Sequence, residues 1–317
     1  MTMENRWLRE TYVDLLLEYA KKDPRIVLVE ADLAKAAGTN RFQKEISDRL
    51  INVGIAEASM VSTAAGLAAM GKVPFTHTFT PFSTRRVCDQ VTLSVAYAGL
   101  KVILMGSDPG VTAELNGGTH MSMEDMAIMR NIPGMLIYEP VDSAQLRKAF
   151  PQILDHDGPV YVRLLRRAAV QIFDENSPFQ LGKAALLREG SDVSIFATGI
   201  MVAEAVEAAE LLAQEGIQAD VINIHTLKPL DRQAVLDSAK KTRAVVTAEN
   251  HSVLNALGSA VAEVLAEECP APLTRVGVQD HFGEVGFTPF LQEKYGLLAK
   301  DIVRAAHNSM EKKGMWK

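Results

Sequence analysis

The segment that decides the fold is NVGIAEASMVSTAAGLAAMGKVPFTHTF, which spans residues 52–79. A short apolar stretch ends at Gly54, an alanine-rich helical pattern follows as far as Met70, and an apolar, β-branched run begins at Val73. Gly71 directly follows the helical pattern, which predicts a C-cap. A strand, a helix and a second strand in this order predict two parallel strands joined by a crossover helix.

The same alternation of strand and helix patterns runs through the whole chain in two series. The first series predicts strands at residues 26–32, 73–79, 101–108, 134–140 and 160–165, with helices at 8–21, 56–70, 83–98 and 143–154. The second predicts strands at 193–199, 219–227, 244–250 and 273–278, with helices at 202–215, 231–240 and 257–267. Between them, residues 166–192 show no sustained period. We therefore predict an α/β protein of two three-layer domains with mostly parallel sheets, at residues 1–170 and 191–317, joined by a linker at 171–190.

Composition narrows the class of protein. The chain has 317 residues, of which 48% are hydrophobic, and this suits two domains of roughly 150 residues each. A net charge of −6 argues against a protein that binds nucleic acid. No apolar run predicts a membrane span or a signal peptide. The two cysteines, Cys88 and Cys269, lie far apart, so we expect neither a disulfide framework nor a zinc site, and a reducing cytoplasm is the expected setting.

Polar and aromatic residues follow several predicted strands. In open parallel sheets, ligands gather at the carboxyl ends of the strands. This rule draws attention to Asp32, to the turn before Glu57, to residues 79–82, to residues 108–120 and to Arg166.

Glu57 lies in the first turn of the helix that follows Gly54. A lone glutamate at this position ordinarily complements the helix dipole. The helix itself is small and apolar on all sides, so we expect it to be buried. An acidic side chain at the mouth of a buried helix needs a specific partner, which makes Glu57 a candidate functional residue.

Two further segments carry candidate residues. In HTFTPFSTRRVCDQV (residues 77–91), Phe79 and Phe82 flank a proline after a strand, and this pattern suits either core packing or stacking on a flat heterocycle. In ELNGGTHMSMED (residues 114–125), His120 precedes a helix start at which Ser122 and Asp125 resemble a capping box. A histidine in such a loop can be a plain surface residue, but it also suits proton transfer or hydroxyl binding.

Taken together and in order, these segments resemble one family, the transketolases. NVGIAEASM resembles the family's GIxE segment, HTFTPFSTRRVCDQV its aromatic loop and NGGTHMSMED its GPTHQPxE segment. Residues 193–231 and the ending DHFGEVGFTPFLQEKYGLLAKDIVRAA resemble the transketolase C-terminal domain. The resemblance covers essentially the whole chain.

The resemblance implies a cofactor and a partner chain. Transketolases bind thiamine diphosphate between two domains of different subunits, and this chain is similar to the aminopyrimidine-binding domain plus the C-terminal domain. The GDG motif of the family's diphosphate and metal site is absent from the sequence. The resemblance therefore implies an N-terminal subunit encoded separately, which supplies the ligands of a Mg or Ca ion, and an α2β2 assembly in which the first domains pair about a two-fold axis.

The resemblance also assigns roles at the cofactor end of the site. Glu57 matches the catalytic glutamate that donates its proton to the aminopyrimidine ring, and a carboxyl group in an apolar setting holds its proton near neutral pH. Phe82 is expected to stack on that ring, with Phe79 lining the same pocket and Asp32 among the cofactor contacts. His120 matches a histidine that contacts the reacting hydroxyl groups of the donor sugar.

The positions that match the substrate-tail contacts are less regular. Arg166 and Arg9 match arginines that bind a phosphate group, which suits bidentate guanidinium chemistry. Asp108, Ala36 and Asn116 depart from the usual histidine, serine and aspartate, and Asp108 adds a negative charge that repels phosphate. His77 replaces a small residue and could compensate. We therefore expect a transketolase with altered sugar specificity, for an unusual sugar phosphate or a sulfosugar.

Three other functions fit parts of the pattern. The first is the beta subunit of the decarboxylating component of a 2-oxoacid dehydrogenase, from which the histidine loop differs. The second is 1-deoxyxylulose 5-phosphate synthase, usually a longer single chain. The third is a structural subunit without catalytic activity. In the C-terminal domain, Glu249 and His251 at a strand end could be functional, but we expect them to cap a helix.

Overall fold

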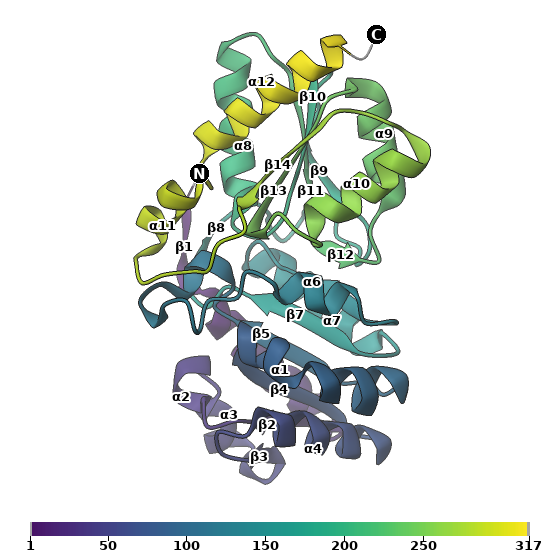
Figure 1. Ribbon diagram of the computed structural model, residues 1–317. Coiled ribbons are helices and arrows are strands. Elements are labelled where there is room, and N and C mark those ends of the chain that lie inside the picture. Colours follow the sequence, from purple (N-terminus) through teal and green to yellow (C-terminus); the bar gives the residue numbers. More distant parts are fainter. Residues whose placement is uncertain (1, 316–317) are drawn as a thin grey trace.

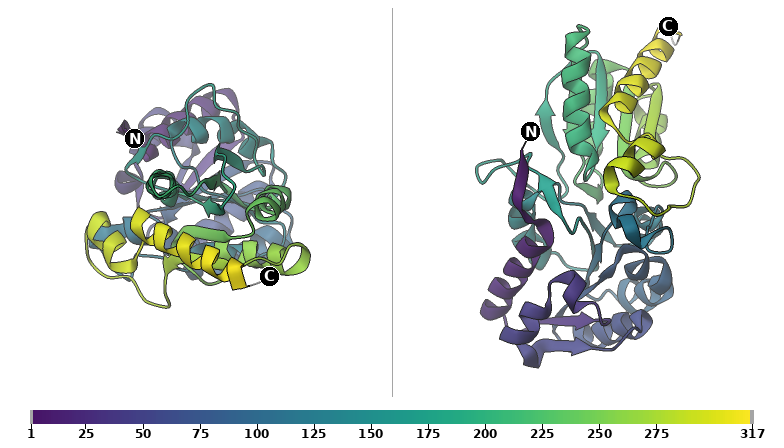
Figure 2. Two further views of the ribbon diagram at one scale, coloured as in Figure 1. Left: turned by 90° about the horizontal axis from the view of Figure 1, so that it is seen from above. Right: turned by 90° about the vertical axis from the view of Figure 1, so that its left-hand side faces the viewer.

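The computed structural model describes residues 2–315. Two sheet-containing units are stacked along the long axis of the molecule (Figure 1 and Figure 2). The strands of the first sheet are β2 (Ile26–Glu30), β3 (Leu50–Asn52), β4 (Val73–Phe79), β5 (Ile103–Ser107), β6 (Leu136–Tyr138), β7 (Val160–Leu164) and β12 (Thr226–Lys228). Those of the second are β9 (Ala185–Arg188), β10 (Val193–Ala197), β11 (Ala219–Asn223), β13 (Val245–Ser252) and β14 (Leu273–Val278).

Both sheets are mostly parallel. The strand order is β12-β6-β7-β5-β4-β2-β3 in the first sheet and β14-β13-β10-β11-β9 in the second. The antiparallel neighbours in these sheets are the edge strands β12 and β9. The predicted α/β class with two mostly parallel sheets is therefore confirmed.

Helices cover both faces of each sheet, as parallel strands require. On the first sheet, α1 (Leu8–Lys22) and α7 (Ser143–Asp155) pack on one face, while α4 (Glu57–Ala69), η3 (Gln90–Tyr97) and α6 (Asp125–Arg130) pack on the other. On the second, α8 (Met201–Gln214) and α12 (Ala299–Met315) face α9 (Arg232–Thr242) and α10 (Leu257–Glu268) across the strands. The short helices are α2 (Ala34–Ala37), α3 (Asn40–Glu45), η1 (Ser47–Arg49), α5 (Thr80–Ser83), η2 (Arg85–Val87), η4 (Gly110–Asn116) and α11 (Thr288–Tyr295).

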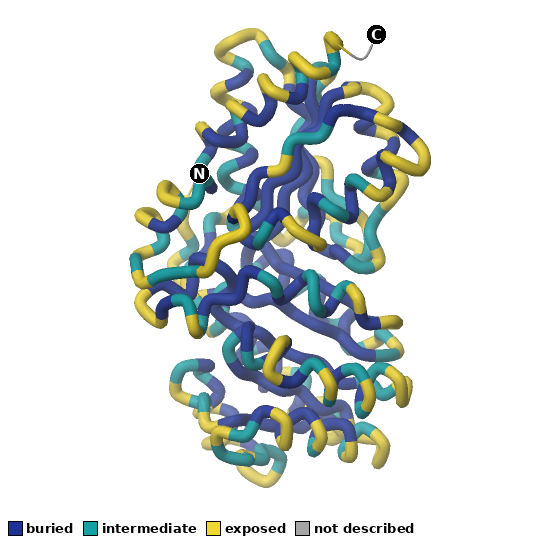
Figure 3. Tube along the Cα trace, viewed as in Figure 1, coloured by how far each residue is buried: buried dark blue, intermediate teal, exposed yellow. Residues whose placement is uncertain are grey.

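The apolar core passes without a break from one unit to the other. The strands are buried along most of their length (Figure 3). One cluster joins Met60 and Met126 of the first unit to Phe196 and Leu257 of the second, and it includes Leu227 of β12. Because β12 leaves the second unit to extend the first sheet, the two units pack as one body.

The stretch predicted to lack regular structure contains two strands. β8 (Ala168–Val170) pairs with β1 (Met3–Trp7) at the N-terminus, and β9 forms an edge of the second sheet. Both strands are short and pair with distant segments, which is why neither gives a periodic signal. The division at residues 171–190 stays a prediction, but that stretch includes the pairing residues of β9.

Two local expectations differ from the structure. The helix predicted at residues 83–98 is broken into α5, a 3-10 turn (η2) and a π-helix (η3). The all-round burial expected of α4 is wrong for the chain by itself, because Ala58, Ser62 and Gly66 lie on an exposed face. The predicted cap at Gly71 is confirmed, with a φ of 81° and an N–H that bonds to the Ala68 carbonyl.

Within residues 2–315, no helix combines the length and the apolar character that a bilayer crossing requires.

Candidate active site

Strand register brings several predicted site residues to one edge of the first sheet. Phe79 pairs with Ser107, and Ser107 pairs with Leu164, so that β4, β5 and β7 end level with one another. Asp108 follows β5 directly and Arg166 follows β7 by two residues. The carboxyl ends of parallel strands thus deliver Phe79, Asp108 and Arg166 to a common edge, as the sequence predicts.

Phe79, Phe82 and His120 form an aromatic cluster at this edge. The ring of His120 lies 5.0 Å from that of Phe82 and 5.7 Å from that of Phe79, with edge-to-face geometry in both pairs. The two phenylalanine rings are 6.2 Å apart. Nδ1 of His120 is 2.9 Å from the hydroxyl oxygen of Thr119. The structure therefore brings together three residues that the sequence placed in two separate motifs.

Arg85 fixes the loop that carries His120. Its guanidinium donates to the carbonyl oxygen of Thr119 at 3.0 Å and to Oε1 of Glu124 at 2.6 Å. These bonds tie the histidine loop to the segment that follows Phe82. Sequence reasoning missed this role, although the adjacent arginines after the aromatic loop are an available signal.

Glu57 begins α4 and is only 5% exposed. Its Oε1 accepts a hydrogen bond from Nη1 of Arg86 at 2.7 Å. The guanidinium carbon of Arg86 also lies 3.6 Å from the centre of the Phe82 ring. A flat group that donates hydrogen bonds can thus reach Glu57 and stack on Phe82 at the same time. The same two side chains suit an aminopyrimidine ring, since it too is flat and can bond to a carboxyl group.

Four side chains form a charged cluster beside Phe79, which we call the tail cluster: Arg9, His77, Asp108 and Arg166. Nε of Arg166 is 3.1 Å from Oδ2 of Asp108, and its guanidinium carbon is 5.9 Å from the Phe79 ring. Arg9 donates to the Ala36 carbonyl and lies near the N-terminal Trp7 ring.

Burial sets the charge of two members of the tail cluster. Burial raises the pKa of Asp108 to about 6, although Arg166 opposes this shift. Burial also lowers the pKa of His77 to about 3, with Arg166 and Arg9 adding to the effect. His77 packs against the Tyr12 ring at 5.4 Å, and the described residues give neither of its ring nitrogens a hydrogen-bond partner.

Asp32 and Asn116 lie at the margins of this arrangement. Asp32 follows β2, on the side of β4 away from Asp108, and its N–H donates to Oδ1 of Asn52 at 3.1 Å. Asn116 ends η4 and is exposed. Their roles in binding cofactor and substrate stay predictions.

A buried ion network, which the sequence reasoning missed, joins the site to the second unit. Arg163 is fully buried in β7 and donates to Asp125 at 2.8 Å, to Glu139 at 2.7 Å and to the Asn250 carbonyl at 2.7 Å. The side chain of Asn250 bonds to Val111 N–H and to the Pro109 carbonyl. The loop after Asp108 is therefore fastened to β13. An arginine within an apolar strand pattern is the sequence signal for such a network.

This network corrects the predicted capping box. Asp125 is fully buried and bound to Arg163 and to the Tyr161 hydroxyl, so it does not cap α6. Glu249 does cap a helix, as expected, because its carboxylate accepts the N–H groups of Leu257 and of the following glycine at the start of α10. The same prediction is wrong for His251, whose ring faces Asp125 instead.

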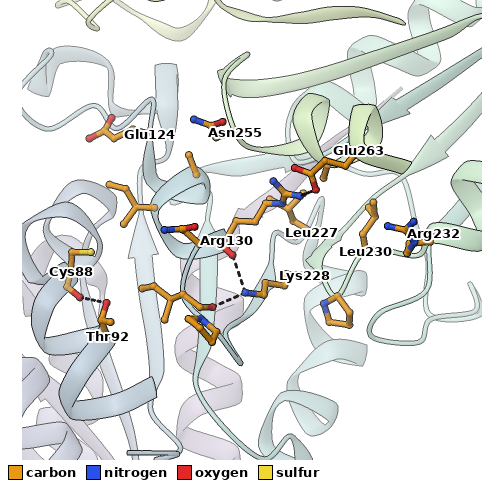
Figure 4. A pocket seen from close by; sticks show the side chains of 17 residues that line it. Cys88, Thr92, Glu124, Arg130, Leu227, Lys228, Leu230, Arg232, Asn255 and Glu263 are labelled. Carbon is orange, nitrogen blue, oxygen red and sulfur yellow. Dashed lines mark hydrogen bonds and ion pairs between the residues drawn. The ribbon is translucent and has the colours of Figure 1, made fainter. Parts of the chain in front are cut away.

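One large cavity lies away from the predicted site residues. It has a volume of about 1160 Å³ and lies between α6 and the segment from β12 to α10 (Figure 4). Lys228 donates to the carbonyls of Arg130 and Ile132 at its wall. None of the predicted site residues lines it. Among residues 2–315, no group of three or more histidine, cysteine or acidic side chains is placed to hold a metal ion.

The fold and the sequence place the chain in a family. Residues 6–171 match the transketolase pyrimidine-binding domain, and residues 182–302 match the transketolase C-terminal domain. The chain therefore belongs to the transketolase family.

Individual relatives resemble the chain over its whole length. It is 70% identical to the 6-deoxy-6-sulfo-D-fructose transketolase subunit SqwH of Clostridium sp. (strain MSTE9), over 98% of this chain and 97% of that protein. It is 37% identical to a putative transketolase C-terminal section of Methanocaldococcus jannaschii, over 96% of each. A solved structure of a split-gene transketolase, described as an inactive β4 tetramer, superposes with a TM-score of 0.88 at 42% identity and covers 97% of this chain and 99% of that one.

Proposed function

We propose that this chain is the C-terminal subunit of a split, thiamine-diphosphate-dependent transketolase that moves a two-carbon ketol unit from a 6-deoxy-6-sulfoketose to an aldose. The observation that carries the reaction type is that Arg86 bridges Glu57 and Phe82, while the His120 ring packs against Phe82. The donor is proposed because the chain is 70% identical to a 6-deoxy-6-sulfo-D-fructose transketolase subunit.

Each residue of the edge has a separate task in this proposal. Thiamine diphosphate, when bound, supplies the nucleophilic carbon that takes up the two-carbon unit. Phe82 holds the aminopyrimidine ring by stacking, and Phe79 walls the same space. Glu57 holds a proton at the ring nitrogen, which requires its carboxyl group to leave Arg86. His120 donates to a hydroxyl group of the sugar, and Asp32 adds a polar contact to the cofactor.

The other end of the sugar faces the tail cluster. Arg166 and Arg9 bind the anionic group, while His77 and Asn116 line the path between. The Phe79 ring is near both His120 and Arg166, so a sugar placed over this ring reaches the reacting end and the charged end together.

A partner chain completes the site. We propose that an N-terminal subunit supplies the diphosphate site and the Mg or Ca ligands, in an α2β2 assembly. The exposed small side chains of α4 leave room for a close partner, and Ile55, Met70, Leu93 and Tyr97 add an exposed apolar surface around it. The inactive β4 tetramer of the split-gene relative fits a chain that needs such a partner.

The test is co-purification with the chain encoded beside it, followed by two-carbon transfer assays with thiamine diphosphate and magnesium. We expect transfer only when both chains are present, and its loss in Glu57→Gln. Glu210→Gln, an exposed change on α8, serves as the matched control and retains activity. Release of carbon dioxide from a 2-oxoacid, in place of ketol transfer, would favour the dehydrogenase function instead.

A further inference from the structure

The tail cluster contains one acidic group among its cations. Asp108 is fully buried, and the described residues donate no hydrogen bond to either carboxylate oxygen. Its nearest charge is Arg166, at 3.1 Å. Arg166 offsets only part of the cost of burying this carboxylate, so packing alone gives no reason for an aspartate here.

The cluster holds two positive charges and one negative charge above neutral pH. Arg9 and Arg166 are the cations. Burial lowers the pKa of Arg9, and the positive charge of Arg166 lowers it further. His77 stays neutral because burial lowers its pKa to about 3. Asp108 is ionised above a pKa of about 6. Arg167 and Glu114 pair with each other, so together they add no net charge to this count, although the charge of each acts on Asp108.

The two anions that a sugar tail commonly carries differ in charge. A sulfonate keeps one negative charge over the whole range in which proteins are folded. A phosphate monoester has a second pKa near 6 and carries about −1.5 to −2 at pH 7. A cluster with a net charge of +1 matches the first anion, whereas a cluster of two unopposed arginines matches the second.

We infer that Asp108 is the residue that makes the tail cluster select a sulfonate and reject a phosphate. This inference rests on the proposed function, since it concerns the donor of that reaction. Asp108 repels the second negative charge of the phosphate, and it also offsets the positive charge of Arg166, which lies 3.1 Å away. Selectivity of this kind comes from a group that repels the competing substrate.

The fastening of the Asp108 loop keeps the carboxylate in place. Asp108 adopts a left-handed backbone conformation with a φ of 57°. A Cβ on the next-but-one residue, Gly110, would approach the Asn250 side chain to 2.3 Å, so the loop packs directly against β13. Asn tolerates the left-handed region about as well as Asp, which makes Asp108→Asn a variant that removes the charge and retains the shape.

The experiment compares kcat/KM for 6-deoxy-6-sulfofructose and fructose 6-phosphate in the two-chain complex at pH 8. At about 5 Å and an effective dielectric constant near 20, one unit of repulsion corresponds to on the order of 100-fold in kcat/KM. We expect Asp108→Asn to lower the preference for the sulfosugar by at least about tenfold after solvent screening. Asp220→Asn, at a buried aspartate of β11 in the second unit, is the matched control and leaves the preference unchanged.

Two further measurements keep the inference separate from the proposed function. Equilibrium binding of both sugars to the complex, by calorimetry, reports the charge selection even when no transfer occurs. Asp108→Gly, which suits the backbone conformation, replaces the asparagine variant if that one fails to fold. A wild-type complex that binds both sugars equally, or a preference that survives both substitutions, would overturn the inference while leaving ketol transfer intact.

Discussion

Replacing Arg163 by methionine is the most severe test of how this site is held together. The guanidinium lies at the junction of the two units and bonds to Asp125, Glu139 and the Asn250 carbonyl. Burial by itself would lower the pKa of Arg163, but the two carboxylates raise it above its ordinary value. Methionine fills much of the same space and removes the charge.

The magnitude follows from what the substitution leaves behind. Asp125 and Glu139 are 0% and 5% exposed, so two carboxylates would remain in the interior without their cation. Breaking a buried ion pair in this way costs about 3–5 kcal/mol, a large part of the 5–15 kcal/mol that stabilises a typical domain. Because Asn250 also holds the loop after Asp108, the tail cluster loses its support as well.

The assay is urea unfolding of the purified chain, followed by fluorescence and by circular dichroism. Arg232→Ala is the control, because Arg232 pairs with Glu267 and Glu268 on the surface and exposed pairs contribute little to stability. Adding Asp125→Asn and Glu139→Gln to Arg163→Met should recover part of the loss, since the buried charges are then removed together. A loss no larger than that of the control would refute the reasoning.

Three other predictions concern single side chains. Glu57→Gln is expected to lower kcat at saturating thiamine diphosphate by about 100-fold or more, because a proton donor is lost, and a kcat within tenfold of wild type would contradict the assignment. Arg86→Met is expected to tighten cofactor binding by about tenfold in a calorimetric titration of the two-chain complex. The cofactor then no longer competes with an ion pair and a cation–π contact, which are worth roughly 1–2 kcal/mol. Weaker binding would show that Arg86 holds the cofactor. His77→Leu is expected to make the free energy of unfolding less dependent on pH under acidic conditions. The pKa of His77 falls to about 3 on folding, so only the unfolded chain binds that proton below about pH 6.5, and wild-type stability drops by up to about 1.4 kcal/mol per pH unit as the pH falls from 6.5 towards 3. Urea midpoints at pH 8 and pH 5 that change equally in both proteins would rule this out.

The fold class and the candidate residues of the site could be predicted from the sequence alone. Strand and helix periods are local properties, so the strands at β2, β4, β5, β7, β10 and β13 could be predicted from their own residues. Glu57 begins α4, Phe79 ends β4, and Phe82 and His120 lie in the segments that follow β4 and β5. Parallel sheets gather their ligands at such positions, so these residues could be singled out.

Other features depend on partners far away in the chain, and only the folded structure shows them. Four short segments, β1, β8, β9 and β12, form strands because they pair with distant segments. The local sequence pattern does not predict such pairing. Asp125 has the sequence pattern of a helix cap, but Arg163, 38 residues later, binds it in the structure. Asn250, which holds the loop after Asp108, lies still farther away in the chain. The chemistry of each side chain follows from the sequence. The charge and geometry of the site depend on which distant groups are buried together when the chain folds.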